Sequence, residues 1–309
     1  MTLINITAHT YLAGYFAIVF DSPVTTLPAS AFASAGLTEL VLPTKLETIE
    51  KEALKYNAGL KELVIPESVT KINPSAFNGD KELTVYFDSE KSPEFVDGYK
   101  SIAAKEFIVP YEGLLKYRSA ALGFAPNIRT IDGREPELDE NHVIYFVPIA
   151  KRGLYGEITG FDLENIYKRF GKETSTGQAY DFGAEKLYCT YSNNKYVLVF
   201  GGNVTRLPQY FGELDLTIEL TEAIIPSTVD YVDQQSLSGH SGYHNTSRVL
   251  YFKSTYPPQM PERTISGGYD PAKSEEYIKT IYVPSQSVAA YKSAAGWSLY
   301  ADRIVGYDY

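Results

Sequence analysis

The chain of 309 residues has little of several things that would point to particular classes of protein. Its one cysteine, Cys189, excludes a disulfide within the chain and a zinc site built from cysteines. No Lys or Arg precedes Lys45 and the net charge is −10 at pH 7, so no basic surface is evident for nucleic acid or anionic lipid. We therefore expect a globular protein without a nucleic-acid partner, in which Cys189 is a small buried residue.

Long apolar runs are absent as well. No stretch approaches the roughly 20 apolar residues of a transmembrane helix. The run Tyr11–Phe20 has no cationic segment before it and is followed by Asp21 and Pro23, so we interpret it as a strand and not as a signal peptide. If the protein is exported, we expect that its signal or lipobox segment has been removed from this sequence.

The sequence does contain a repeat of 22 or 23 residues. The phrase Val24-x-x-Leu27-x-x-x-Ala31-Phe32 returns in the same form at residues 46–54 and 69–77. A second phrase, Leu37-x-x-Leu40-x-Leu42-Pro43, returns at residues 60–66. Apolar residues that keep their register at a fixed period indicate stacked supersecondary units.

The second phrase predicts one short parallel strand per repeat. Its last two apolar residues are two positions apart and so share one side of a strand, which the proline ends. We expect the Ala-Phe pair of the first phrase on the return path, with its large side chain in the interior. If the leucines of the second phrase point inward, Val41 and Val64 point outward and Tyr86 continues their row.

The second half of the chain repeats the first. Pro110 and Pro284 are 174 residues apart, as are Tyr117 and Tyr291, and in each half a predicted strand ends at the proline before a short helix. Ser285 is the expected N-cap of the second of these helices. Both copies also begin with a matched strand, at residues 15–20 and 196–200.

We therefore expect a tandem duplication with a boundary in the polar stretch 132–136. Residues 1–134 form an N-terminal module of about three coils and a cap. Residues 135–309 form a C-terminal module of about two coils and a cap, with an insert at about 142–182 that has no counterpart. Within the insert, Asp162 precedes apolar residues at helical spacing up to Phe170, which predicts an amphipathic helix.

These repeats resemble the Bacteroidetes-type BspA-like leucine-rich-repeat surface proteins, whose coils combine the same two phrases. The ending from Ile281 through Tyr291 to Trp297 resembles the ending common in such proteins from gut and oral anaerobes. The resemblance covers about 24–134 and 204–309. It implies a mainly β fold with short helices, a right-handed solenoid in two tandem modules, each with a hairpin or strand entry and a strand-proline-helix cap. It also implies a surface-exposed or secreted protein that binds other macromolecules, and it implies no catalytic residues.

Residues that would carry metal or catalytic chemistry form no convincing pattern. His240 and His244 are four apart, but Gly239 and Gly242 argue against a helix and no third ligand is near, so we expect a flexible loop. The pairs at 201–202 and 267–268 are glycine turns without the features of a phosphate loop. We predict no catalytic residue, no metal and no cofactor.

Tyrosine is the unusual component, with 26 residues against a single tryptophan. Tyrosine suits half-buried strands, where the ring packs inward and the hydroxyl reaches water. It also supplies contact area in protein interfaces, and its ring can stack on sugars. Both interpretations stay open at this point.

The outward strand face is the candidate ligand-binding site. We expect it to include Val41, Glu62, Val64, Tyr86, Ile224 and Tyr251. An apolar row on an open face needs a cover, which is either another part of the chain or a partner.

The leading hypothesis is a non-enzymatic, adhesin-like binding protein at the cell surface or outside the cell, with a host or bacterial surface protein as partner. The alternative is a glycan-binding protein of a polysaccharide-utilisation system. A hydrolase whose cleft is built by residues 142–182 comes third. The sequence leaves the oligomeric state open.

Overall fold

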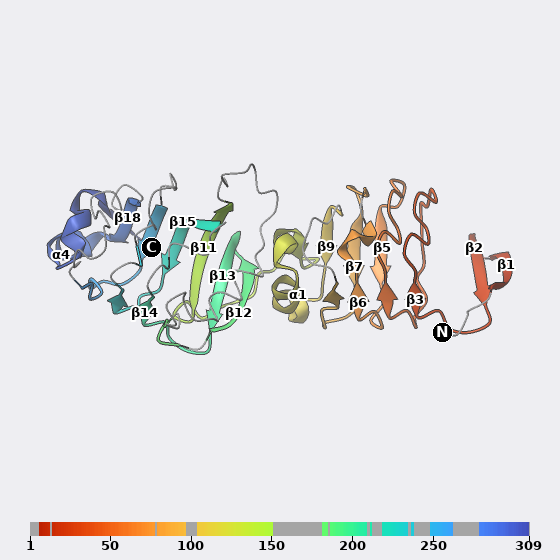
Figure 1. Cartoon of the computed structure of the whole chain (residues 1–309), viewed down its shortest axis with the longest axis horizontal. Helices are drawn as coiled ribbons and strands as arrows, with labels where there is room; N and C mark the ends of the chain where they lie inside the picture. Colours follow the sequence, from red (N-terminus) through yellow and green to blue (C-terminus); the bar gives the residue numbers. More distant parts are fainter. Residues whose placement is uncertain are drawn as a thin grey trace, which may run out of the picture. The chain divides into compact units, whose positions relative to one another are not determined.

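The computed structural model of the protein describes residues 6–12, 14–77, 79–96, 104–150, 181–184, 186–208, 211, 218–233, 236–237, 248–261 and 278–308. The chain divides into two compact units, Met1–Pro136 (unit 1) and Glu137–Tyr309 (unit 2) (Figure 1). Glu135, next to the division, accepts two hydrogen bonds from the guanidinium of Arg118, at 2.6 and 2.9 Å. Because Arg118 is 3% exposed, this ion pair fixes the end of unit 1 to its core.

Unit 1 contains two parallel sheets where the sequence predicted one strand per repeat. One sheet, which we call the second-phrase sheet, contains the strand of the second phrase at residues 60–66. Its strands, in spatial order, are β5 (Glu62–Ile65), β7 (Thr84–Phe87), β9 (Glu106–Ile108) and β10 (Ile128–Arg129). The first phrase, predicted to be a return path, forms the other sheet. Its strands are β3 (Thr26–Leu27), β4 (Thr48–Ile49), β6 (Lys71–Ile72) and β8 (Glu94–Phe95).

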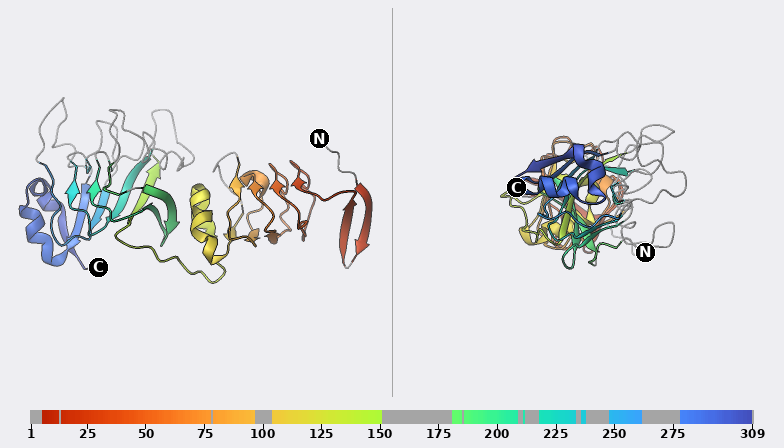
Figure 2. Two further views of the ribbon diagram at one scale, coloured as in Figure 1. Left: turned by 90° about the horizontal axis from the view of Figure 1, so that it is seen from below. Right: turned by 90° about the vertical axis from the view of Figure 1, so that its left-hand side faces the viewer.

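The strands of the return path are short for a simple reason. In each pair of residues the second is apolar and buried, while the first faces outward, as with Lys71 and Ile72. Two residues are enough for this alternation and for one step of the ladder. Figure 2 shows the short strands of unit 1 following one another along the unit, joined by the turns of the chain.

The predicted alternation in the other sheet is confirmed. Leu63 and Ile65 are each 1% exposed, whereas Val64 between them is 50% exposed. Val64 pairs with Tyr86, and Tyr86 pairs with Ile108, but Ile108 is 6% exposed, so the open part of this row spans β5 and β7. Ala53, Ala76 and the large residues that follow them are fully buried, as expected for close approach between coils.

The prediction for the first repeat was wrong in two respects. Its Ala-Phe pair does not lie in the interior, because Ala31 is exposed and Phe32 is only partly buried against the core. Residues 37–43 form no strand, and in the described part of the chain β5 is the last strand of its sheet on that side. Ser34 and Gly36 both adopt positive φ just before this segment, so the chain turns there and does not continue into a ladder. Leu42 still points into the core at 7% exposure, and Val41 is 76% exposed.

The predicted strand Tyr11–Phe20 is in fact part of a hairpin. β1 (Ile6–Leu12) pairs antiparallel with β2 (Tyr15–Phe20). Gly14, with φ of +92°, lies at the turn. This conformation is open to glycine at little cost, which explains why the apolar run is broken at this point.

The cap of unit 1 follows the predicted strand and proline. It consists of a 3₁₀ turn at Tyr111–Gly113, the helix α1 (Leu114–Ala120) and a 3₁₀ helix at Leu122–Asn127. Tyr117 is 1% exposed, and its hydroxyl donates to the carbonyl oxygen of Ser89 at 2.9 Å. The helix therefore closes the end of the core and is tied to the coil before it.

Unit 2 is built on one seven-stranded sheet in the order β12-β13-β11-β15-β17-β18-β19. The strands are β11 (Val143–Ala150), β12 (Lys186–Ser192), β13 (Lys195–Phe200), β15 (Ile218–Ile225), β17 (Arg248–Phe252), β18 (Ile278–Pro284) and β19 (Ile304–Tyr307). The last four run parallel, like the coils of unit 1. A second small sheet pairs β14 (Arg206–Leu207) with β16 (Tyr231–Val232).

The predicted insert at 142–182 begins with β11, which lies antiparallel between β13 and β15 (Figure 1). The helix predicted from Asp162 to Phe170 lies outside the described residues, as do His240, His244 and the glycines at 267–268. Cys189 is buried, as predicted. His142 is half-buried, with its Nε2 3.7 Å from a carboxylate oxygen of Asp139.

The cap of unit 2 repeats that of unit 1. Its elements are a 3₁₀ turn at Ser285–Ser287, α4 (Val288–Ser293) and a 3₁₀ helix at Trp297–Arg303. The hydroxyl of Tyr291 donates to the carbonyl oxygen of Ser254 at 3.0 Å, which is the counterpart of the bond from Tyr117. Ser285 was predicted to be the N-cap of the helix, but Ser287 occupies that position because a 3₁₀ turn precedes the helix.

Candidate functional site

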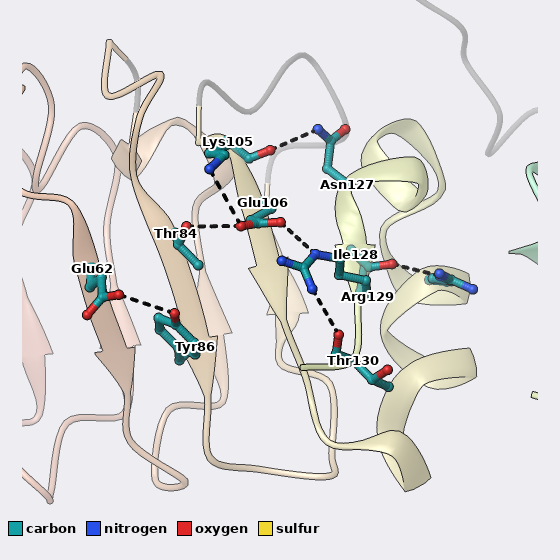
Figure 3. A network of polar contacts seen from close by, with 10 residues as sticks. Glu62, Thr84, Tyr86, Lys105, Glu106, Asn127, Ile128, Arg129 and Thr130 are labelled. Carbon is teal, nitrogen blue, oxygen red and sulfur yellow. Dashed lines mark hydrogen bonds and ion pairs between the residues drawn. The ribbon is translucent and has the colours of Figure 1, made fainter. Parts of the chain in front are cut away.

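The outward face of the second-phrase sheet in unit 1 is mainly polar (Figure 3). Tyr86 donates its hydroxyl hydrogen to Glu62 on the neighbouring strand at 3.3 Å. Glu106 accepts from Thr84 at 3.2 Å and from Nε of Arg129 at 2.6 Å. These five side chains form what we call the polar strand face: Glu62, Thr84, Tyr86, Glu106 and Arg129.

The electrostatics of the polar strand face favour an ionised Glu106. The hydrogen bond from Arg129 lowers the pKa of Glu106, and the same bond raises the pKa of Arg129. Burial, and after it the charge of Glu62, raises the pKa of Tyr86. Both glutamates are thus paired with donors, and the face offers a ligand hydrogen bonds and an exposed Val64 instead of an unpaired charge.

The outward face of the sheet in unit 2 is aromatic. Ile224, Tyr251 and Tyr282 are paired in register on β15, β17 and β18. The rings of Tyr251 and Tyr282 stack with centroids 4.8 Å apart and an interplanar angle of 16°. Tyr307, 43% exposed, lies edge-on to both rings, at 5.5 and 5.7 Å. We call Tyr251, Tyr282 and Tyr307 the tyrosine cluster.

The tyrosine cluster exposes ring edges and hydroxyls. Stacking at 4.8 Å matches the spacing of neighbouring strands, so the ring faces of Tyr251 and Tyr282 point along the row and not toward solvent. The next residues in that row are Ile224 on one side and Val305 on the other. Burial, and after it the charge of Glu222, raises the pKa of Tyr251. Glu222 itself is paired with the ammonium group of Lys195.

The structure distributes the six predicted site residues over three places. Val64 and Tyr86 are in register on adjacent strands, and Glu62 bonds to Tyr86. Ile224 and Tyr251 are in register in unit 2. Val41 is exposed but lies in the first repeat, outside the sheet.

Sequence reasoning missed Tyr282, Tyr307 and the pair formed by Glu106 and Arg129. Tyr282 could have been found, because it precedes Val283-Pro284 as Tyr251 precedes Phe252 in the strand before it. The pair Glu106 and Arg129 has no such signal. It depends on β10, a strand of two residues that no phrase of the repeat announces.

The surface hollow found in unit 2 offers no catalytic cleft. An open pocket of about 410 Å³ in unit 2 is lined by Tyr231, Pro257, Pro258, Gln259, Met260, Pro261, Ala294 and Ala295. No carboxylate or imidazole lines it, so it holds no pair of groups for acid and base catalysis. Among the described residues no group of three or more His, Cys, Asp or Glu side chains is placed to hold a metal ion.

Comparison with protein families identifies BspA type leucine-rich repeats, in six copies, over residues 4–92. This confirms the predicted resemblance for that part of the chain, which contains the polar strand face as far as Tyr86. A comparison with curated proteins gave no match. The matched family is a repeat region and not an enzyme domain. Within the described ranges, the helices are all too short or too polar to cross a bilayer.

Proposed function

We propose that this protein is a non-enzymatic binding protein that acts at the cell surface or outside the cell and holds another protein on the outward faces of its parallel sheets. In this proposal the two sheets of unit 1 are faces of a right-handed leucine-rich-repeat solenoid. The repeats support it, because repeat proteins present extended surfaces to macromolecular ligands. The outward residues Glu62, Val64, Tyr86, Ile224 and Tyr251 carry the binding, with Val41 at the edge.

The tyrosine cluster is the observation that carries the proposal. Three tyrosine rings lie together on an outward sheet face, and Val305 beside them is 45% exposed. Tyrosine offers a large contact area with only two side-chain torsions to fix, and it is enriched among the residues that dominate binding energies. The rings also hold one another in place, which lowers the entropy that a partner has to remove.

Saturable binding to immobilised extracellular-matrix proteins tests this proposal. We expect Tyr251→Ala and Tyr282→Ala each to weaken binding by at least about tenfold, the effect of about 1.4 kcal/mol. Tyr256→Ala is the matched control, because Tyr256 is 80% exposed and lies outside the cluster. Absence of saturable binding to both a protein panel and a glycan panel would contradict the proposal.

Glycan capture is the second candidate. It rests on the same three rings, since tyrosine can stack on sugars. Stacking on a sugar requires an open ring face, however, whereas the cluster presents edges. Trp297, the other residue suited to sugars, is fully buried and donates its Nε1 hydrogen to the carbonyl oxygen of Pro258 at 2.7 Å. Retarded migration in gels that contain soluble polysaccharide, lost in Tyr307→Ala, would favour the glycan.

A further inference from the structure

Both units contain a β hairpin of the same geometry. In β1–β2 Tyr11 pairs with Phe16, and in β12–β13 Tyr191 pairs with Tyr196. The rings of each pair meet edge to face with centroids 5.2 Å apart. Both hairpins have one register shift, near the start of the first strand. Each hairpin is followed by the first phrase of a repeat, which begins at Val24 in unit 1 and at Val204 in unit 2. They are therefore two copies of one element.

The two hairpins differ in burial. Leu198 and Val199 of β13 are 0% and 7% exposed. Ile18 and Val19, at the corresponding places in β2, are each 44% exposed, and Phe16 is 90% exposed. The side chains are equally apolar, so the difference arises from what covers them and not from their chemistry.

In unit 2 the strand β11 forms part of that cover, together with Leu138 and Tyr188, which pack on the same cluster as Val199. β11 pairs antiparallel with β13, and Ile144 lies opposite Leu198. Phe146 is 1% exposed and packs on the ring of Tyr196 at 5.9 Å. The other edge of β11 pairs with β15, the first of the parallel strands. One inserted strand thus joins the hairpin to the repeats.

Unit 1 lacks this strand within the described residues. There β2 pairs with β1 alone, and residues 37–43, at the place of β15, form no strand. Residues 6–20 contain neither charge nor proline. Charged residues and prolines are the usual features that keep an open strand edge from pairing with other chains, and this hairpin has neither. An uncharged apolar edge of this kind is suited to accept a strand.

We propose that unit 1 binds one extended strand of a partner polypeptide along the free edge of β2, in the place that β11 occupies in unit 2. The partner strand is uncharged and rich in β-branched and aromatic residues, like residues 143–147, and runs antiparallel to β2. A lone strand fits better than the hairpin of a second copy, because β11 is paired on both of its edges. This site is separate from the outward sheet faces and does not depend on their function.

Hydrogen exchange of the full chain alone is the first test. We expect amides of residues 15–20 to exchange at least about a hundredfold faster than those of residues 195–200, because only the latter lie between two strands. Equal protection of the two segments would overturn the proposal, since the edge of β2 would then be covered by the chain itself.

A peptide with the sequence of residues 141–149, flanked by lysines for solubility, is the second test. We expect it to bind the full chain saturably in fluorescence anisotropy and to slow exchange at residues 15–20. Ile18→Lys and Phe16→Lys should weaken binding by at least about tenfold, because a lysine would have to be buried against the new strand. The same kind of change at an exposed isoleucine outside the hairpin, Ile131→Lys, should leave binding unchanged, because Ile131 is 76% exposed and belongs to neither strand of the hairpin.

Three further outcomes would overturn the proposal. The peptide could fail to bind, or it could bind equally well to Ile18→Lys and to the unchanged chain. The third outcome is a dimer in light scattering that becomes a monomer in Phe16→Lys, which would make a second copy the occupant.

A peptide with proline in place of Ile144 should not bind, because proline removes a ladder donor. Thermal melts of the lysine variants should match that of the unchanged chain, since both positions are exposed.

Discussion

Successive coils of unit 1 carry different residues at one buried position. Asn57 is fully buried and donates to the carbonyl oxygens of Phe32 and Leu54 at 2.8 and 2.7 Å. Its own side-chain oxygen accepts from the amide of Leu37 at 3.0 Å. The next coil has Asp80 at this position, 1% exposed, and neither carboxylate oxygen has a hydrogen-bond partner of good geometry. The Asn57 side chain ties two coils together as both donor and acceptor, whereas an ionised Asp80 carboxylate has no hydrogen to donate.

Asp80→Asn should stabilise the protein by about 1–2 kcal/mol near neutral pH, because the amide can donate as Asn57 does. Burial raises the pKa of Asp80 above its ordinary 3.8, while the backbone amide of Asn57 acts in the opposite direction. When the pKa of a carboxyl is higher in the folded than in the unfolded state, the folded protein becomes less stable as the pH rises from about 3.8 through the folded-state pKa. The gain in Asp80→Asn should therefore grow over this range and then level off. Urea unfolding at several pH values measures it, and a gain that shrinks as the pH rises would refute this account.

Phe77→Ala should lower the free energy of unfolding by about 3–5 kcal/mol, because Phe77 is fully buried between coils and its removal leaves a cavity. Glu62→Ala should cost under about 0.5 kcal/mol, since Glu62 is exposed and accepts one long hydrogen bond. Thermal and urea melts compare the two variants. Equal losses would contradict the assignment of inward and outward positions.

At the scale of elements, the two caps have the same arrangement in three dimensions. Tyr117 and Tyr291 are both buried, and each donates to a serine carbonyl oxygen in the coil before the cap. Burial raises the pKa of Tyr117, so its hydroxyl stays a neutral donor. Trp297 packs edge-on against Tyr291 at 4.9 Å and completes the second cap. The cap is thus a packed unit with one fixed hydrogen bond.

Tyr117→Phe and Tyr291→Phe should each destabilise their unit by about 1–3 kcal/mol, because a buried carbonyl oxygen loses its donor while the ring still fills the core. Tyr256→Phe serves as the control, since this ring is 80% exposed and removal of its hydroxyl should change stability by less than about 0.5 kcal/mol. Urea unfolding measures all three. No loss in either cap variant would mean that this bond contributes nothing to either cap.

At the scale of the whole molecule, the two units have separate interiors. The core of unit 1 draws its residues from Leu27 to Ile128, and Arg118 holds Glu135 at its end. The sheet of unit 2 runs from β11 to β19. We propose that the two units are independent modules, with a boundary near residues 134–136.

Calorimetry of the full chain tests this independence. Phe77→Ala should lower one unfolding transition by about 10 °C or more, because each kcal/mol is worth roughly 4 °C in a unit of this size. Trp297→Ala should lower the other transition in the same way. If either substitution moved both transitions together, the units would form one cooperative structure.

The sequence by itself determined the repeat, the caps and the direction of side chains along β5. Leu63, Val64 and Ile65 alternate in burial because a strand places successive side chains on opposite faces, which is a local property. The buried cap tyrosines follow from spacing along one helix and from comparison of the two halves.

Tertiary structure alone decided the second sheet of unit 1, the tyrosine cluster and the position of β11. Each depends on strands that are far apart in the sequence, such as Val143 beside Val199 or Tyr251 beside Tyr282. Two-residue strands and cross-strand pairs have no local signal, because they are stabilised by the neighbours that they meet and not by their own pattern. The matched hairpins show most clearly what the sequence cannot decide, since nearly the same apolar pattern is buried in unit 2, where β11 and other residues pack on it, and exposed in unit 1.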